Sequence, residues 1–318
     1  MPLCNTPRVL PSTLKGPGWR GRDDAHVDDV RGGAVWAPYR VNSEVARLKA
    51  VLLTWPSDEL SFTGAPNDWL MAERPDLAAM RREAGAIAAF YESIGAAVHW
   101  IRARTAAPPN LVFARDLVFM TPEGAVLARM AARQRAGEER LAAIALAEAG
   151  VPILATPRGN ATLEGADVMW ARPDLVLVGL GNRTNEAGFA TVGRVLADQG
   201  VRCIGVALPA SVQHLLGSIN LLDHDLAVAY DATPSMREAL AEAGIRTLDF
   251  VDVPEVTVAR ALNFVTVAPR EIVMPANAPL TRTRLEAAGV RCHELVVDQY
   301  LRAEGALGCL TGVLAREG

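Results

Sequence analysis

Five stretches of the chain repeat one pattern, in which a helix-like segment ends at a glycine and is followed by a β-type run. They read ESIGAAVHWI, LAEAGVPILA, LADQGVRCIG, LAEAGIRTLD and LEAAGVRCHE, with the glycines at positions 95, 150, 200, 244 and 289. Glycine directly after a helix favours a left-handed cap, and the β-branched residues that follow favour a strand. The repeat therefore predicts five similar structural modules.

The segments between these glycines also recur, because most hold two short apolar runs joined by a turn. They read LVFMTPEGAVLAR, VMWARPDLVLVGL, NLLDHDLAVAY and NFVTVAPREIVMP. Each module then reads strand, strand, helix, strand, and a repeat of this length is typical of a radial or linear array. The last strand, from about Cys309 to Arg316, has no module of its own. We expect it to close a ring against residues 48–53.

A closed ring of this kind predicts an α/β fold, namely a five-bladed pseudosymmetric α/β propeller whose loops meet at a central cavity. We expect residues 41–318 to form it as a single catalytic domain. The start of the chain is rich in Pro, Gly, Arg and Asp and shows no periodicity. Residues 1–40 are therefore expected to form an extended arm.

The overall composition limits the classes of function. Half of the 318 residues are hydrophobic and the net charge is −4, so we expect no nucleic acid and no anionic membrane as a partner. No apolar run approaches the ~20 residues of a membrane helix, and prolines and glycines interrupt any signal-peptide pattern. The four cysteines form no CxxC pair, as is usual for a reduced intracellular protein. We expect a cytoplasmic protein.

One cysteine, Cys309, lies in the small-residue stretch GALGCLT near the end of the chain. A catalytic cysteine acts as a thiolate and needs a base or a positive charge nearby, and the alternative is a small buried apolar residue. Of the five histidines, His214 in SVQHLLG is best placed to reach the cavity, although a lone histidine is more often structural. No spacing typical of a zinc site and no GxSxG motif of a serine hydrolase is found.

Three further stretches place polar residues beside apolar strands: PNLVFARD, LEGADV and GLGNRTNE. In the first, Arg115 and Asp116 face either a ligand or each other, because an unpaired buried charge is costly. In the second, Glu164 and Asp167 either lie together at a strand tip or serve as turn residues. The third lacks the last glycine of the GxGxxG nucleotide-binding pattern. Arg183 in this stretch is better placed to hold a carboxylate.

Taken in order, the stretches resemble the motifs of the guanidine-modifying enzymes of the pentein fold. This superfamily includes dimethylarginine dimethylaminohydrolases, arginine deiminases and arginine:glycine amidinotransferases. PNLVFARD is similar to PN..F.RD, LEGADV to EGGD, GNRTN to RTN, QHLLG to the histidine motif, and GALGCLT to the terminal GG…C[LM][ST]. The resemblance runs from about residue 41 to residue 316. Five motifs in the right order, over a fivefold repeat, are far more specific than one.

The resemblance implies a cysteine-dependent hydrolase of a guanidino compound, arginine or an Nω-substituted arginine, that yields a ureido product such as citrulline and an amine. Cys309 would attack the guanidine carbon and form a covalent thiouronium. His214, oriented by Glu164, would protonate the departing amine and then activate water. Asp116 would bind the guanidinium, and Asp167 would contribute to the same site.

The resemblance also implies that Arg129 and Arg183 hold the α-carboxylate of the substrate, although both could instead make structural ion pairs. No metal and no organic cofactor is called for. The expected partner is a small guanidino substrate, and the sequence also allows a homo-oligomer. Residues 56–75, which Gly and Pro punctuate, are expected to be a lid over the intermediate or else an ordinary surface loop.

Two departures from the family motifs bear on the substrate. Arginine deiminases and amidinotransferases carry HxD, whereas Leu216 stands at the third position here. The dimethylaminohydrolases also lack this aspartate, which suits an alkylated guanidine nitrogen. Ala166 replaces the second glycine of EGGD, and residues 306–307 replace part of the glycine run before the cysteine. The rival hypotheses are an amidinotransferase, which passes the amidino group to an amine, and a catalytically silent propeller that serves as a binding module.

Overall fold

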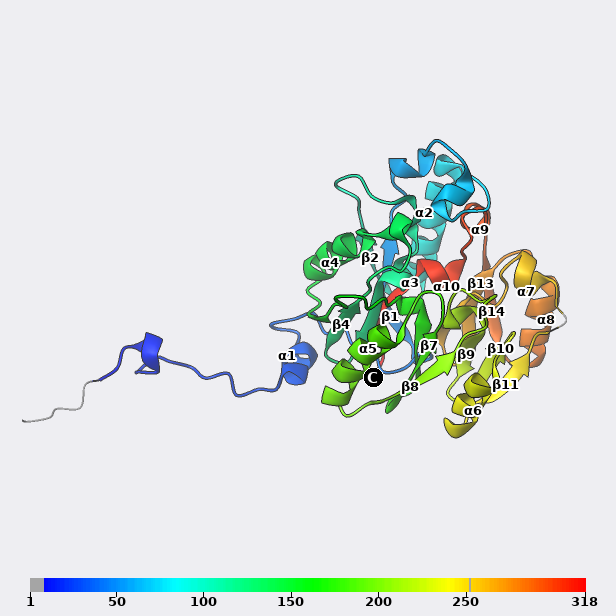
Figure 1. The fold of residues 1–318 in the computed structure, drawn as a ribbon. Helices are drawn as coiled ribbons and strands as arrows, with labels where there is room; N and C mark the ends of the chain where they lie inside the picture. The colour runs from blue at the N-terminus through cyan, green and yellow to red at the C-terminus, as the bar shows by residue number, and fades with distance from the viewer. Residues whose placement is uncertain (1–8, 252) are drawn as a thin grey trace, which may run out of the picture.

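In the part of the chain that the structure describes, five three-stranded sheets form the body (Figure 1). The computed structural model describes residues 9–251 and 253–318. Each sheet contains one antiparallel and one parallel strand pair. The molecule is therefore a single-domain, five-bladed α/β propeller, as the repeat in the sequence predicts.

The two ends of the ring meet in one sheet. The last strand, β15 (Gly312–Arg316), pairs antiparallel with β1 (Leu48–Thr54), and β1 pairs in parallel with β2 (Ala97–Ile101). The expected closure of the ring against residues 48–53 is confirmed. The expected start of the last strand at Cys309 is wrong, because the short helix α10 (Leu307–Leu310) holds the cysteine just before the strand begins.

The other four sheets share one order, in which an antiparallel hairpin is followed by a helix and by a strand parallel to the second strand. The sheets are β3 (Val118–Thr121), β4 (Gly124–Leu127) and β5 (Ile153–Ala155); β6 (Val168–Arg172), β7 (Leu175–Leu180) and β8 (Arg202–Ala207); β9 (Ile219–Asp223), β10 (Leu226–Ala229) and β11 (Arg246–Asp249); and β12 (Val265–Ala268), β13 (Glu271–Pro275) and β14 (Arg291–Leu295). All four predicted hairpins are confirmed.

A helix precedes the third strand of each of the five sheets. These repeat helices are α2 (Leu77–Ser93), α4 (Glu138–Glu148), α5 (Glu186–Asp198), α6 (Pro234–Glu242) and α8 (Pro279–Ala287). The glycine after each helix has a positive φ, with values of 81°, 73°, 73°, 76° and 81° at Gly95, Gly150, Gly200, Gly244 and Gly289. This left-handed conformation ends the helix and suits glycine, which has no Cβ to clash.

The residues before β1 run along and away from the ring. Residues 9–25 extend from the body in Figure 1, whereas α1 (His26–Gly32) is tied to the ring where His26 Nε2 lies 3.0 Å from the Glu123 carbonyl oxygen. The division into an arm of residues 1–40 and a catalytic ring of residues 41–318 stays a prediction. Among the described residues, no helix has the length and apolar character needed to cross a bilayer.

Buried aromatic side chains join neighbouring modules. Trp170 on β6 is 1% exposed and stacks on Phe119 of β3, with ring centroids 5.7 Å apart. Its indole Nε1 donates a hydrogen bond to the Met120 carbonyl at 3.0 Å, so the polar end of the buried ring is satisfied. This packing fixes β3 and β6 relative to each other, and with them the polar segments that precede these two strands.

Candidate active site

One polar side chain precedes an edge strand in each of the five sheets. These side chains are Asp116 in α3 (Ala114–Leu117) before β3, Glu164 before β6, His214 before β9, Asn263 before β12, and Cys309 in α10 before β15. Equivalent positions in a closed ring face a shared centre, so residues that are distant in the sequence meet there. Their hydrogen bonds, and the cavities that four of them line, define the candidate site.

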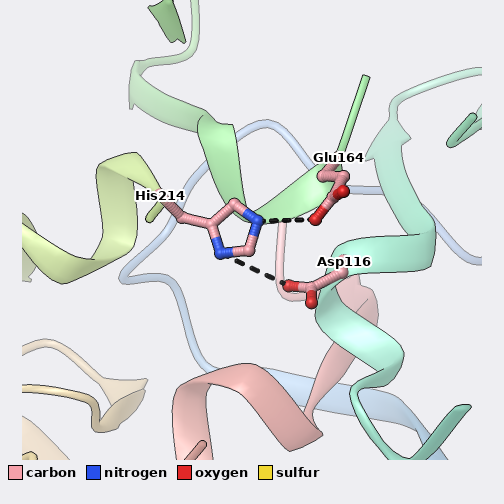
Figure 2. Close-up of side chains that lie close together, drawn as sticks. All are labelled: Asp116, Glu164 and His214. Atoms are coloured by element: carbon pink, nitrogen blue, oxygen red, sulfur yellow. Dashed lines mark hydrogen bonds and ion pairs between the residues drawn. The ribbon is translucent and has the colours of Figure 1, made fainter. Parts of the chain in front are cut away.

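His214 lies between two carboxylates that come from different modules (Figure 2). Its Nε2 is 2.7 Å from Glu164 Oε2, and its Nδ1 is 3.9 Å from Asp116 Oδ1. All three side chains are buried. A charge-assisted hydrogen bond of this length fixes the orientation of the ring, because both partners are held in rigid surroundings. The structure thus brings together three of the residues that the sequence singled out.

The carboxylates decide the protonation state of His214. Burial alone would lower the pKa of His214, but Asp116, the hydrogen bond to Glu164 and Asp167 outweigh burial and raise that pKa above its ordinary value. Burial alone would raise the pKa of Glu164, but the hydrogen bond to His214 and the charges of His214 and Arg135 lower it. At neutral pH the pair is therefore an imidazolium and a carboxylate, and His214 is able to donate a proton.

Arg135 is a buried cation of the site that the sequence interpretation missed. Its Nη1 is 2.6 Å from Asp116 Oδ2 and 3.6 Å from Glu164 Oε2. Its Nη2 is 2.8 Å from Glu138 Oε2, and the guanidinium lies over the Phe113 ring, 5.7 Å from the centroid. The stretch AARQRAGEER gave no sign of burial, since oppositely charged residues three apart usually mark a solvated helix face.

The alternative of an internal Arg115–Asp116 pair is wrong. Arg115 Nη2 lies 3.1 Å from Glu44 Oε1 and also donates to the Val168 carbonyl at 3.1 Å. Asp116 pairs with Arg135 instead. Successive side chains on a helical turn point about 100° apart, so these two neighbours on α3 serve different partners.

A glycine allows Glu164 to approach the Asp116 segment. A Cβ on Gly165 would lie 2.4 Å from the Val118 carbonyl oxygen and 2.5 Å from the Arg115 carbonyl oxygen. Backbone atoms cannot move aside at such distances, so a side chain at this position would push the two segments apart. The glycine of LEGADV is therefore required for the close packing that sets Glu164 beside Asp116.

Asp167 uses both carboxylate oxygens to position its neighbours. Thr184 Oγ1 donates to Asp167 Oδ2 at 2.7 Å, and the Leu215 N–H donates to Oδ1 at 3.0 Å. Burial raises the pKa of Asp167 to about 6, although the nearby His214 charge and both hydrogen bonds oppose the rise. The structure gives Asp167 a positioning role next to His214. Its contribution to the guanidinium site stays a prediction.

The two arginines expected to hold a carboxylate are placed differently. Arg183 Nη1 lies 3.4 Å from Glu164 Oε1, and its side chain lines a small cavity next to Cys309. Arg129 Nη1 donates to the Ala161 carbonyl at 2.8 Å, and among the described residues it is not part of the wall of that cavity or of the larger one beside it. The structure thus brings Arg183 to the site and leaves Arg129 outside.

Cys309 is held by Asn263, a second residue that the sequence interpretation missed. Asn263 Nδ2 lies 3.0 Å from Cys309 Sγ. Burial and then the Asp116 charge raise the pKa of Cys309, whereas the Ala306 backbone and the Asn263 side chain act against this rise. The net effect is upward, so the thiol keeps its proton at neutral pH in the free protein. Asn263 begins the predicted hairpin NFVTVAPREIVMP, and its place before β12 was the available signal.

Two adjoining cavities meet at Cys309. The larger encloses about 340 Å³, and its walls include His214, Leu216, Tyr230, Asp231, Arg260 and Asn263. The smaller encloses about 20 Å³, and its walls include Leu70, Asn110, Phe113, Asp116, Arg135 and Arg183. Gln213, Glu304 and Cys309 line both. Within the described part of the chain, Asn110 Oδ1 and Asp116 Oδ1 are buried and lack a hydrogen-bond partner, so two acceptors are available at the smaller cavity.

The stretch expected to be a lid reaches the smaller cavity through Leu70, which has a φ of 58°. This stretch contains the short helices η2 (Asp58–Ser61) and η3 (Pro66–Trp69). The Glu73 N–H donates to the Arg302 carbonyl at 2.9 Å, which ties the stretch to α9 (Asp298–Arg302), shortly before Cys309. Its function as a lid stays a prediction.

Asp116, Glu164 and His214 each offer one ligand atom, and these atoms lie within 4.8 Å of one another, as in a metal site. The Arg135 guanidinium already pairs with both carboxylates from within the protein, at 2.6 Å and 3.6 Å. A metal ion would also need neutral His214, whereas the surrounding carboxylates keep this ring protonated. This chemistry does not favour a metal.

The chain is similar in sequence and in structure to proteins that act on arginine derivatives. The arginine deiminase family model matches residues 103–246. An uncharacterised protein of Aeropyrum pernix is 30% identical over 209 residues, which cover 64% of this chain and 72% of that protein. The N(G),N(G)-dimethylarginine dimethylaminohydrolase of Pseudomonas aeruginosa is 25% identical over 203 residues, covering 64% and 76%. A structure of the Pseudomonas aeruginosa enzyme with citrulline superposes with a TM-score of 0.70 and 22% identity, covering 85% of this chain and all of that one (100%).

We predict that Glu164→Gln lowers the pKa of His214 by about 1 to 3 pH units, because the substitution removes the hydrogen-bonded charge that favours the imidazolium. The titration is followed by NMR of the histidine ring nitrogens, with His214→Ala to assign the signal. Glu271→Gln is the matched control, since Glu271 Oε1 lies 2.8 Å from a different ring, that of His293. It should leave the His214 titration unchanged. A His214 midpoint that does not move in Glu164→Gln would contradict this account.

Proposed function

Because the chain belongs to the guanidine-modifying enzymes of the pentein superfamily, we propose that it is a cysteine hydrolase of arginine or an Nω-substituted arginine. Hydrolysis of the C–N bonds of linear amidines is its general activity, and the proposed products are a ureido compound such as citrulline and an amine. The observation that carries the proposal is that Cys309, His214 and Asp116 line two adjoining cavities that share Cys309.

The guanidinium is proposed to bind at the smaller cavity. Asp116 Oδ1 and Asn110 Oδ1 are buried there, and they accept hydrogen bonds but cannot donate them. A guanidinium is planar and offers only N–H donors, so it matches this pair of acceptors and the Asp116 charge. Phe113 lies on the same wall. Arg135 holds Asp116 Oδ2, which leaves Oδ1 for the substrate.

The first half-reaction forms a covalent thiouronium. Cys309 loses its proton to solvent as the cationic substrate binds, because a positive charge nearby favours the thiolate and His214 is already protonated. The sulfur then attacks the guanidine carbon, and a C–S bond forms. His214, held protonated by Glu164, donates its proton to the departing nitrogen as the C–N bond breaks. The amine leaves, and the amidino carbon stays on Cys309.

The second half-reaction consumes water. His214 is now neutral and accepts one proton from a water molecule, whose oxygen attacks the thiouronium carbon; the second proton of this water passes to solvent as the C=O group forms. The C–S bond breaks, the ureido product forms, and Cys309 returns as a thiolate. Leu70 and its loop are proposed to close the smaller cavity during this step, so that only the hydrolytic water reaches the intermediate.

The α-carboxylate of the substrate is proposed to contact a cation, and its substituted guanidine nitrogen an apolar side chain. Arg183 lines the smaller cavity and is proposed to hold the α-carboxylate. Leu216 lines the larger cavity, so a carboxylate does not face the substrate from this position, which suits an alkylated or otherwise less polar guanidine nitrogen. The larger cavity also has room for the departing amine.

An amidinotransferase is the second candidate, and the size of the larger cavity favours it. About 340 Å³ beside Cys309 and His214 would admit an amine acceptor as well as a leaving amine. An amine would then attack the thiouronium in place of water. A silent binding module is the weaker rival, since Cys309 and His214 line the same cavity and Glu164 is bonded to His214.

We predict that the purified protein converts a guanidino compound to a ureido product without an added acceptor, and that Cys309→Ala abolishes this turnover. Products are identified by mass spectrometry after incubation with arginine, Nω-methylated and Nω-hydroxylated arginines, agmatine and guanidinoacetate. Each incubation is repeated with glycine or lysine as an acceptor. Product that forms only with the acceptor would replace the hydrolase by the amidinotransferase, and turnover by the Cys309→Ala variant would rule out covalent catalysis.

We also predict that Arg183→Gln raises the KM for arginine by about 10- to 100-fold, the loss expected for a hydrogen-bonded ion pair. Agmatine lacks the carboxylate, so its KM should stay unchanged. An equal rise for both substrates would show that Arg183 acts through Glu164 instead. Arg129→Gln is the matched control, because its guanidinium is bonded to the Ala161 carbonyl, and it should leave both KM values unchanged.

A further inference from the structure

Asn263 makes two contacts with the reactive cysteine and a third with the glycine before it. Its Nδ2 lies 3.0 Å from Cys309 Sγ, and its Oδ1 accepts the Cys309 N–H at 3.0 Å. Its backbone carbonyl accepts the Gly308 N–H at 3.1 Å. We propose that Asn263 is a catalytic residue, whose amide fixes the direction of the Cys309 sulfur and stabilises its thiolate. Its part in turnover rests on the proposed function, whereas its effect on the thiol does not.

The hydrogen-bond pattern leaves only one orientation for the amide. The Cys309 backbone N–H can only donate, so the atom that faces it must be the acceptor Oδ1. The two N–H groups of Nδ2 therefore point to the side of the sulfur. A neutral thiol is a weak acceptor, whereas a thiolate is a charged one, and hydrogen bonds to charged groups are the stronger class. The contact thus favours the deprotonated sulfur.

The glycine before Cys309 makes room for this contact. A Cβ on Gly308 would lie 2.8 Å from Asn263 Oδ1 and 3.0 Å from Leu216 Cδ2. Any side chain at this position would press on the same amide oxygen that holds the Cys309 N–H. The contact between Asn263 and Cys309 therefore depends on Gly308, because this glycine lets α10 approach the segment before β12.

The groups around Cys309 show why its thiolate needs a hydrogen-bond donor. Burial and the Asp116 charge oppose a thiolate, whereas the Ala306 backbone, the Asn263 amide and the Arg260 charge favour it. Arg260 is engaged by Glu304, which lines both cavities, so its charge is partly neutralised. Asn263 is a neutral side-chain donor whose Nδ2 lies 3.0 Å from the sulfur.

The experiment measures the pH dependence of Cys309 alkylation by iodoacetamide, with no substrate present. The Cys309 peptide is quantified by mass spectrometry, which separates it from the other cysteines. Asn263→Ala should raise the pH midpoint by about 1 to 2 units, and so slow alkylation at neutral pH by about 10- to 100-fold. Asn263→Asp keeps an acceptor for the Cys309 N–H but places a negative charge beside the sulfur, so the midpoint should rise at least as far.

The control is Asn182→Ala, which removes a surface amide that donates to the Ala210 carbonyl at 3.2 Å, and it should leave the midpoint unchanged. Circular dichroism checks that each variant folds. A folded Asn263→Ala or Asn263→Asp variant with the wild-type midpoint would overturn the proposal. A shifted midpoint in a protein that hydrolyses no guanidine would support the role of Asn263 and refute the proposed function, so the two failures are distinguishable.

Discussion

The candidate site depends on the pairing of charges that are buried together at the centre of the ring. Asp116, Glu138 and Glu164 share the Arg135 guanidinium, and Glu164 also holds His214. Breaking one such pair typically costs about 3–5 kcal/mol, because the remaining charge stays buried without a partner. The same contacts set the chemistry: they keep His214 protonated and occupy Asp116 Oδ2, so that Oδ1 is left for a ligand.

The ring provides this arrangement from residues that are far apart in the sequence. Each sheet contributes the polar side chain that precedes one of its edge strands, from Asp116 before β3 to Cys309 before β15. The backbone repeats closely enough for these side chains to meet, whereas the side chains themselves differ in every module. A structural repeat with five different polar residues thus yields an acceptor, an orienting carboxylate, a proton donor, an amide and a thiol in one place.

The fold could be predicted from the sequence because the helix-ending glycines and the apolar hairpins are local signals. Four residues of the site could be named as well, because each lies in a recognisable motif and the motifs occur in the expected order. They are Asp116, Glu164, His214 and Cys309. Arg135 and Asn263 could not be recognised locally: one resembles a residue of a solvated helix, and the other resembles the start of an ordinary strand. Their roles come from partners 19 and 46 residues away, which only the folded ring brings into contact.

Covalent catalysis by Cys309 requires that a carbon of the substrate becomes bonded to its sulfur during turnover. Rapid acid quench of the protein with its best substrate, followed by intact mass and peptide mapping, tests it most directly. The account predicts a transient mass increase on the Cys309 peptide that equals the substrate less its departing amine and that decays as the ureido product accumulates. Product that forms at the full rate while Cys309 stays unmodified at every quench time would contradict the account.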